Sequence, residues 1–71
     1  MNTKMKLLLQ DRKVKLKLLK AQLKTSKDLI CEIKAISISF QKYEQAVIEW
    51  EIEKILGQSL ESIDELLKNK D

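Results

Sequence analysis

The chain has 71 residues, of which 44% are hydrophobic and 35% are charged, a mixture that is typical of helical bundles and too apolar for a disordered chain. With no proline, one glycine and one cysteine, it lacks the turn residues of an all-β fold and cannot close an internal disulfide. The net charge of +3 conceals a division, because residues 1–27 carry nine Lys or Arg and one acid, whereas residues 28–71 carry five Lys and ten acids. A chain this short buries little apolar surface by itself, so we expect it to form an oligomer.

The first predicted element is a helix over residues 3–24. On a helical wheel its apolar residues form two stripes on opposite sides. One stripe contains Met5, Leu8, Leu9, Leu16, Leu19 and Leu23, and the other contains Leu7, Val14, Leu18 and Ala21. A helix with two apolar stripes needs two neighbours, whereas a single hairpin provides one. This helix therefore favours an oligomeric bundle.

Basic residues fill one gap between these stripes. This lysine stripe consists of Lys6, Lys13, Lys17, Lys20 and Lys24. Lysines along one helix face can bind phosphates without reading a base sequence, so the stripe is the candidate anion-binding surface. The alternative is a solvated face that pairs with acids from the rest of the chain. We favour this alternative, because the segment has no aromatic residue to stack on a base and has one arginine, Arg12.

A turn is predicted near residues 24–27. Thr25 and Asp28 have the spacing of a capping box, which indicates that a second helix begins at about residue 26. No glycine or proline forces a break there. One continuous or kinked helix through this point is therefore the alternative.

The second helix is predicted over residues 26–56, where apolar residues follow alternating spacings of four and three. This predicted seam consists of Leu29, Ile33, Ile36, Phe40, Tyr43, Val47 and Trp50. Because the spacing is typical of coiled coils and includes all the aromatic residues of the chain, we interpret it as the core and interface of the bundle. Residues 36–40 and 48–52 also alternate as strands do, but the segment between them lacks a turn-forming residue.

Gly57 is the predicted end of the second helix, because glycine can adopt the left-handed conformation found after helix C-termini. A short third helix is predicted over residues 59–68, with Ser59 or Ser62 as its cap. Acids early in this segment and lysines late in it suit the helix dipole.

These patterns predict an all-α fold in a single domain over residues 1–71. Its elements are a helical hairpin with a turn near residues 24–27 and a short third helix after Gly57, assembled as an oligomeric bundle or coiled coil. The hairpin would place the basic first helix beside Glu32, Glu44 and Glu49. Exposed ion pairs contribute little, so apolar burial must supply most of the stability.

The sequence indicates no catalytic, cofactor or metal site. Histidine, the commonest acid–base catalyst and a frequent zinc ligand, does not occur in the chain. Cys31 therefore lacks a histidine partner, and we interpret it as a small, half-buried apolar residue. Glu49 and Glu53 lie one helical turn apart but lack the histidine that accompanies such pairs in metal-binding bundles.

We therefore expect a non-enzymatic protein–protein interaction module, a small regulator, inhibitor or assembly factor that acts through helix faces in a homo-oligomer and binds a protein partner. The alternative is a nucleic-acid-binding accessory protein that uses the lysine stripe. No apolar stretch approaches the length of a membrane span, and two stripes do not suit a helix that lies on a membrane. We thus expect no membrane partner and a cytoplasmic location.

Overall fold

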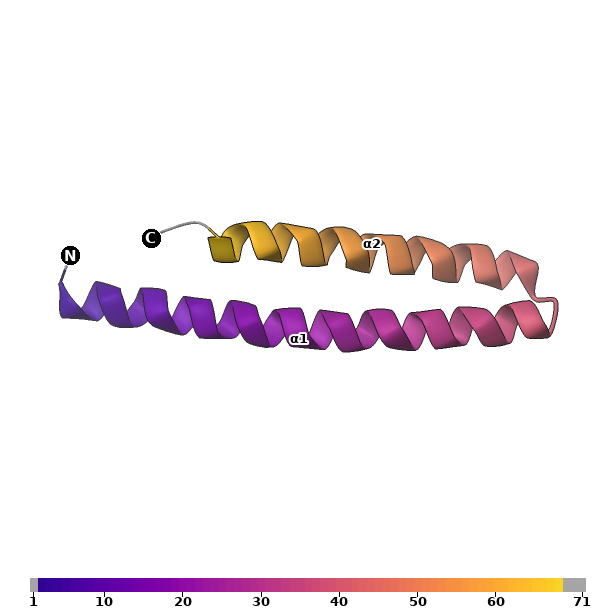
Figure 1. The fold of residues 1–71 in the computed structure, drawn as a ribbon, viewed down its shortest axis with the longest axis horizontal. Helices are drawn as coiled ribbons and strands as arrows, with labels where there is room; N and C mark the ends of the chain where they lie inside the picture. Colours follow the sequence, from indigo (N-terminus) through magenta and orange to yellow (C-terminus); the bar gives the residue numbers. More distant parts are fainter. Residues whose placement is uncertain (1, 69–71) are drawn as a thin grey trace.

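The computed structural model describes residues 2–68 as two antiparallel helices joined by a short turn. Helix α1 spans Thr3–Ser39 and helix α2 spans Tyr43–Lys68. The helices lie side by side along a molecule 58 Å long, and the first turns of α1 extend past the end of α2 (Figure 1). The prediction of an all-α helical hairpin is confirmed.

Helix α1 passes through residues 24–27 without a break, so the turn predicted there and the helix boundaries 3–24 and 26–56 are wrong. Thr25 does not cap a helix. Its hydroxyl donates to the carbonyl of Ala21 at 3.1 Å, a bond that a threonine makes inside a helix. The continuous helix, which was the alternative, is the observed structure.

The chain reverses at Phe40, Gln41 and Lys42. Gln41 has a left-handed backbone, with φ of 60°. Its N–H donates to the carbonyl of Ile38 at 3.0 Å, and the N–H of Lys42 donates to the carbonyl of Ser37 at 2.8 Å. These are the two hydrogen bonds of a Schellman motif, which usually has glycine where Gln41 stands.

Helix α2 continues through Gly57 to Lys68, so the predicted stop at Gly57 and the separate third helix over residues 59–68 are also wrong. The backbone of Gly57 is not left-handed. Leu56 and Leu60, on either side of the glycine, are half-buried against α1. This packing stabilises the helix across a residue that weakens it by about 1 kcal/mol.

The helices face each other through a set of residues that we name the inner seam, with alternating spacings of three and four. On α1 the inner seam contains Leu16, Lys20, Leu23, Lys27, Ile30, Lys34 and Ser37. On α2 it contains Ala46, Glu49, Glu53, Leu56, Leu60, Ile63 and Leu67. Every one of these residues is buried or half-buried. The seam is mostly polar near the turn and mostly apolar toward the open end of the hairpin.

Little apolar surface is buried within the hairpin. Among residues 2–68 the buried apolar side chains are those of Ile30, Ala46 and Ile63. The residues of the predicted seam are exposed, from 46% for Ile33 to 73% for Phe40: Leu29, Ile33, Ile36, Phe40, Tyr43, Val47 and Trp50. They are not the core of one hairpin, because the turn at residues 40–42 divides them between two helices. Their role as an interface stays a prediction.

Candidate functional site

The two broad sides of the hairpin differ in composition. Residues that directly follow inner-seam residues lie on one side, which we name the groove side. Ile38 and Trp50 are two of them, and they line the same groove of about 340 Å³ near the turn. The other residues of this groove are Lys34, Tyr43, Ala46 and Val47. Further along the hairpin the groove side carries charged residues of both signs, among them Lys24 and Asp64.

The opposite side carries the residues that directly precede the inner-seam residues. On α1, from Leu19 toward the turn, these are Leu19, Gln22, Ser26, Leu29, Ile33 and Ile36, followed by Phe40 at the turn. On α2 they are Gln45, Ile48, Ile52, Ile55, Ser59, Ser62 and Leu66. None of these residues is charged, although 35% of the chain is. Lys15, which precedes Leu16, is charged and lies outside this surface. We name this surface the charge-free face. Its residues are exposed except Ser59, which is half-buried.

The charge-free face has more exposed apolar surface than a monomer usually carries. Its large apolar side chains are exposed from 40% for Leu66 to 73% for Phe40. Together they expose roughly 1,000 Å², whereas the largest apolar patch of a typical monomer covers about 300–600 Å². Patches of this size mark surfaces that bind another protein or a membrane.

Near the turn, the inner seam contains a network of polar side chains. The Ser37 hydroxyl donates to Glu49 Oε1 at 2.8 Å. Glu53 accepts from two residues of α1: the Cys31 thiol donates to its Oε1 at 3.2 Å, and the Lys34 ammonium donates to its Oε2 at 2.5 Å. Paired charges between helices often stabilise little, but they can fix the register in which the helices pack.

The pairing at Glu53 shifts the pKa of all three groups. The hydrogen bond from Lys34, and then that from Cys31, holds the pKa of Glu53 below its ordinary value of 4.5. The same carboxylate raises the pKa of Lys34. It also raises the pKa of Cys31, where the hydrogen bond to Glu53 is the largest cause and burial adds to it. Cys31 is half-buried as expected, but it acts as a hydrogen-bond donor rather than as an apolar residue.

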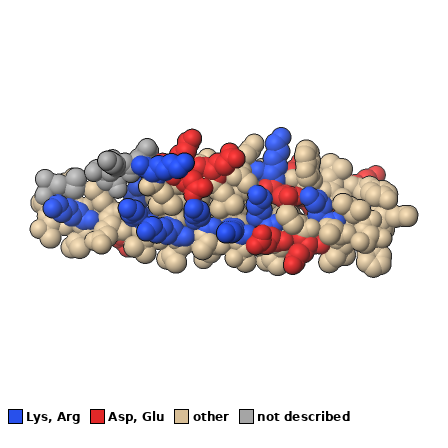
Figure 2. Space-filling view, viewed as in Figure 1, with Lys and Arg blue, Asp and Glu red and all other residues tan. Residues whose placement is uncertain are grey.

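The lysine stripe is neutralised only in part. Lys20 lies on the inner seam and pairs with Asp64 at 2.6 Å. The other members are exposed: Lys6, Lys13, Lys17 and Lys24. The expected pairing with Glu32, Glu44 and Glu49 is wrong. Glu32 lies on α1 itself, and Glu44 and Glu49 lie at the start of α2, beside the end of α1 that is remote from the lysine stripe. Figure 2 shows the resulting row of basic side chains along α1.

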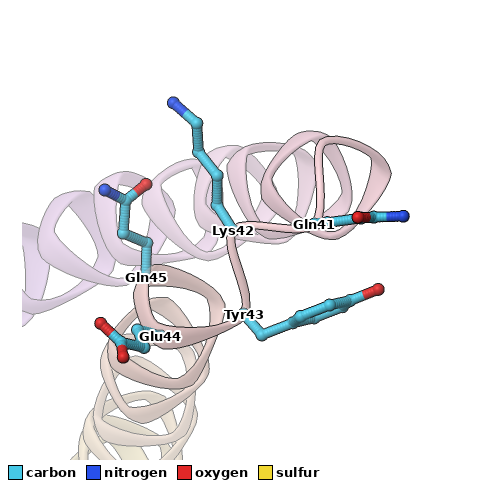
Figure 3. A pocket seen from close by; sticks show the side chains of 5 residues that line it. All are labelled: Gln41, Lys42, Tyr43, Glu44 and Gln45. Atoms are coloured by element: carbon cyan, nitrogen blue, oxygen red, sulfur yellow. The ribbon is translucent and has the colours of Figure 1, made fainter.

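The hollow over the turn has no convergent polar groups. It is lined by Gln41, Lys42, Tyr43, Glu44 and Gln45, whose side chains point outward in different directions (Figure 3). Within residues 2–68 no three His, Cys, Asp or Glu side chains gather to hold a metal ion. Neither of the two described helices is long and apolar enough to cross a membrane.

No protein-family model, curated protein or solved structure matches the chain. Two surfaces distinguish the hairpin from an ordinary pair of amphipathic helices. These are the charge-free face and the exposed members of the lysine stripe.

Proposed function

We propose that the chain is a non-enzymatic protein–protein interaction module, a small cytoplasmic regulator, inhibitor or assembly factor that acts through helix faces in a homo-oligomer and binds a protein partner. The observation that supports this proposal is the charge-free face. Water solvates apolar surface poorly, so a face of this size gains free energy when another apolar surface covers it.

The composition of the face favours a protein as its ligand. Charged residues are depleted at the centre of protein–protein interfaces, and this buried centre is more apolar than the rest of a protein surface. The charge-free face fits this description, because isoleucines and leucines of the two helices form most of it and none of its residues is charged. Nucleic acids require basic side chains instead, and small-molecule sites require a concave pocket with convergent polar groups.

Sedimentation equilibrium at micromolar concentration tests the self-association. We expect a mass of at least twice the 8.3 kDa of one chain. A species of 8.3 kDa that keeps its full helix content would contradict the proposal, because the exposed apolar face would then be stable in water.

The exposed lysines support a second candidate function, the binding of nucleic-acid phosphates. A variant with Lys13, Lys17 and Lys24 changed to Gln tests it against a control in which Lys42, Lys54 and Lys68 are changed to Gln. Each variant loses three positive charges, and all six lysines are exposed. If the stripe binds DNA, only the first change should reduce the slope of log affinity against log salt, by up to about 3. A parent protein that does not bind DNA at low salt would exclude this function.

A further inference from the structure

We propose that a second copy of this chain covers the charge-free face, stacked face to face and pointing in the opposite direction, so that two hairpins form a four-helix bundle. The inference rests on the proposed self-association and adds to it the surface and the arrangement. It follows from the area of the face, its limits, the sizes of its residues and the distribution of charge along the hairpin.

The area of the face suits a second copy. Each chain offers roughly 1,000 Å² of exposed apolar side chains, and each partner of a specific interface contributes about 800 Å². A two-fold dimer pairs the same patch on both chains, so the patch must be compatible with itself. A surface without charge meets this condition, because it brings no like charges together.

The limits of the face define how far the two copies overlap. On α1 the series of residues that precede the inner seam continues from Leu19 back to Lys15 and Arg12, which are charged and exposed. At the other end the face stops at Phe40 in the turn. Full overlap of the two faces would cover the uncharged residues, including serines and glutamines, and would leave Lys15 and Arg12 in water. The midpoint of the overlap lies near Leu29 and Ile55.

The sizes of the residues favour opposite directions. The large residues Ile33 and Ile52 lie between this midpoint and the turn, whereas the small residues Ser26 and Ser59 lie between the midpoint and the open end. When the second copy is reversed, α1 packs on α1 and α2 on α2, and each large residue faces a small one. Large side chains opposite small ones allow two layers to interdigitate. With both copies in the same direction, isoleucine would face isoleucine and serine would face serine.

The charge along the hairpin also favours the reversed arrangement. Residues 3–18 of α1 lie beyond the charge-free face and carry six Lys or Arg and one acid. Reversed copies place these two basic segments, one from each copy, at opposite ends of the bundle. Copies with both turns at one end would place them side by side, and like charges brought together are unfavourable.

A charge introduced into the face tests the surface. Ile52→Lys places a lysine in the face, and the control Gln58→Lys places one at an exposed position of α2 outside both the face and the inner seam. We expect Ile52→Lys to raise the dissociation constant of the dimer by at least about 100-fold, because each dimer would bury two unpaired charges. Gln58→Lys should dimerise as the parent does. An Ile52→Lys dimer of unchanged affinity would overturn the assignment of this face and leave self-association intact.

A distance between the two chains tests the direction independently. A spin label at Lys42→Cys, in a Cys31→Ser background that keeps a donor for Glu53, marks the turn of each copy. At a rise of 1.5 Å per residue, fully overlapped and reversed copies should hold the labels about 35–40 Å apart. A separation below about 20 Å would overturn the reversed arrangement, since it would place both turns at one end. A parent that sediments as a monomer would overturn both this inference and the proposed function.

Discussion

Gln41, in the turn between the two helices, has a backbone conformation that is unfavourable for most residues other than glycine. Its left-handed backbone, with φ of 60°, costs a residue with a Cβ about 1–2 kcal/mol, and glycine avoids this cost. Glycine also loses more freedom on folding. We therefore expect Gln41→Gly to stabilise the protein by about 1 kcal/mol, measured by urea unfolding. As a control, Lys42→Gly should destabilise it, because the backbone of Lys42 is not left-handed. Loss of stability in Gln41→Gly would show that the turn has another geometry.

Gly57 is a weak point inside α2. A Cβ added there would lie 3.7 Å from Lys27 Nζ and 3.9 Å from its Cε, which are ordinary contacts with the end of a flexible side chain. Gly57→Ala should therefore raise the free energy of unfolding by about 0.5–1 kcal/mol through helix propensity. The converse change, Ala35→Gly at an exposed position of α1, should lower it by a similar amount. If Gly57→Ala destabilised the protein instead, the Lys27 side chain would be unable to move away from the added Cβ.

Between the two helices, the pairing of Glu53 with Lys34 and Cys31 makes stability depend on pH. The pKa of Glu53 is lowered on folding, so its contribution is complete above pH 4.5 and is lost as the pH falls through the folded value. The pKa values of Cys31 and Lys34 are raised, so their contributions are complete below pH 9.0 and 10.5 and are lost as the pH rises through the raised values. We expect maximal stability between about pH 5 and pH 9, measured by urea unfolding across this range.

Glu53→Gln provides the matched test of this pairing. It removes the negative charge while it keeps a carbonyl acceptor, so the loss of stability at low pH should become smaller. The thiolate of Cys31 should form more readily, and alkylation of Cys31 at pH 8 should become several-fold faster. Equal alkylation rates in parent and variant would show that Glu53 does not hold the thiol proton.

The sequence predicted that the chain forms long helices in a hairpin, but it misplaced the turn. The apparent capping box at Thr25 and Asp28 resembles a helix start, whereas Thr25 bonds within α1. The true turn has no glycine, proline, asparagine or aspartate, and Gln41 carries no signal of its left-handed backbone. A further pattern was missed in the sequence: Lys6, Lys13, Lys20, Lys27 and Lys34 recur every seven residues. That period is the signal of a coiled-coil position, and the last three lie on the inner seam.

In the whole molecule, the candidate surface follows from the register of the two helices and not from either helix alone. Leu29, Ile33, Ile36 and Phe40 were recognised as an apolar series, but Tyr43, Val47 and Trp50 lie on the other side of the hairpin. The isoleucines of α2 that complete the charge-free face, such as Ile52, join them only once the turn is known to be at residues 40–42. Residues that would lie on different faces of one continuous helix cannot form a single surface. A hairpin can bring such residues together, one set from each of its two helices.

We expect the folded chain to depend on a second copy that covers its charge-free face. The most direct test is the melting temperature measured by circular dichroism at chain concentrations from about 5 µM to about 500 µM. Because association stabilises the folded state by mass action, the melting temperature should rise by roughly 10 °C over this range. The same melting temperature at both concentrations would contradict this dependence, because the hairpin would then fold with its apolar face in water.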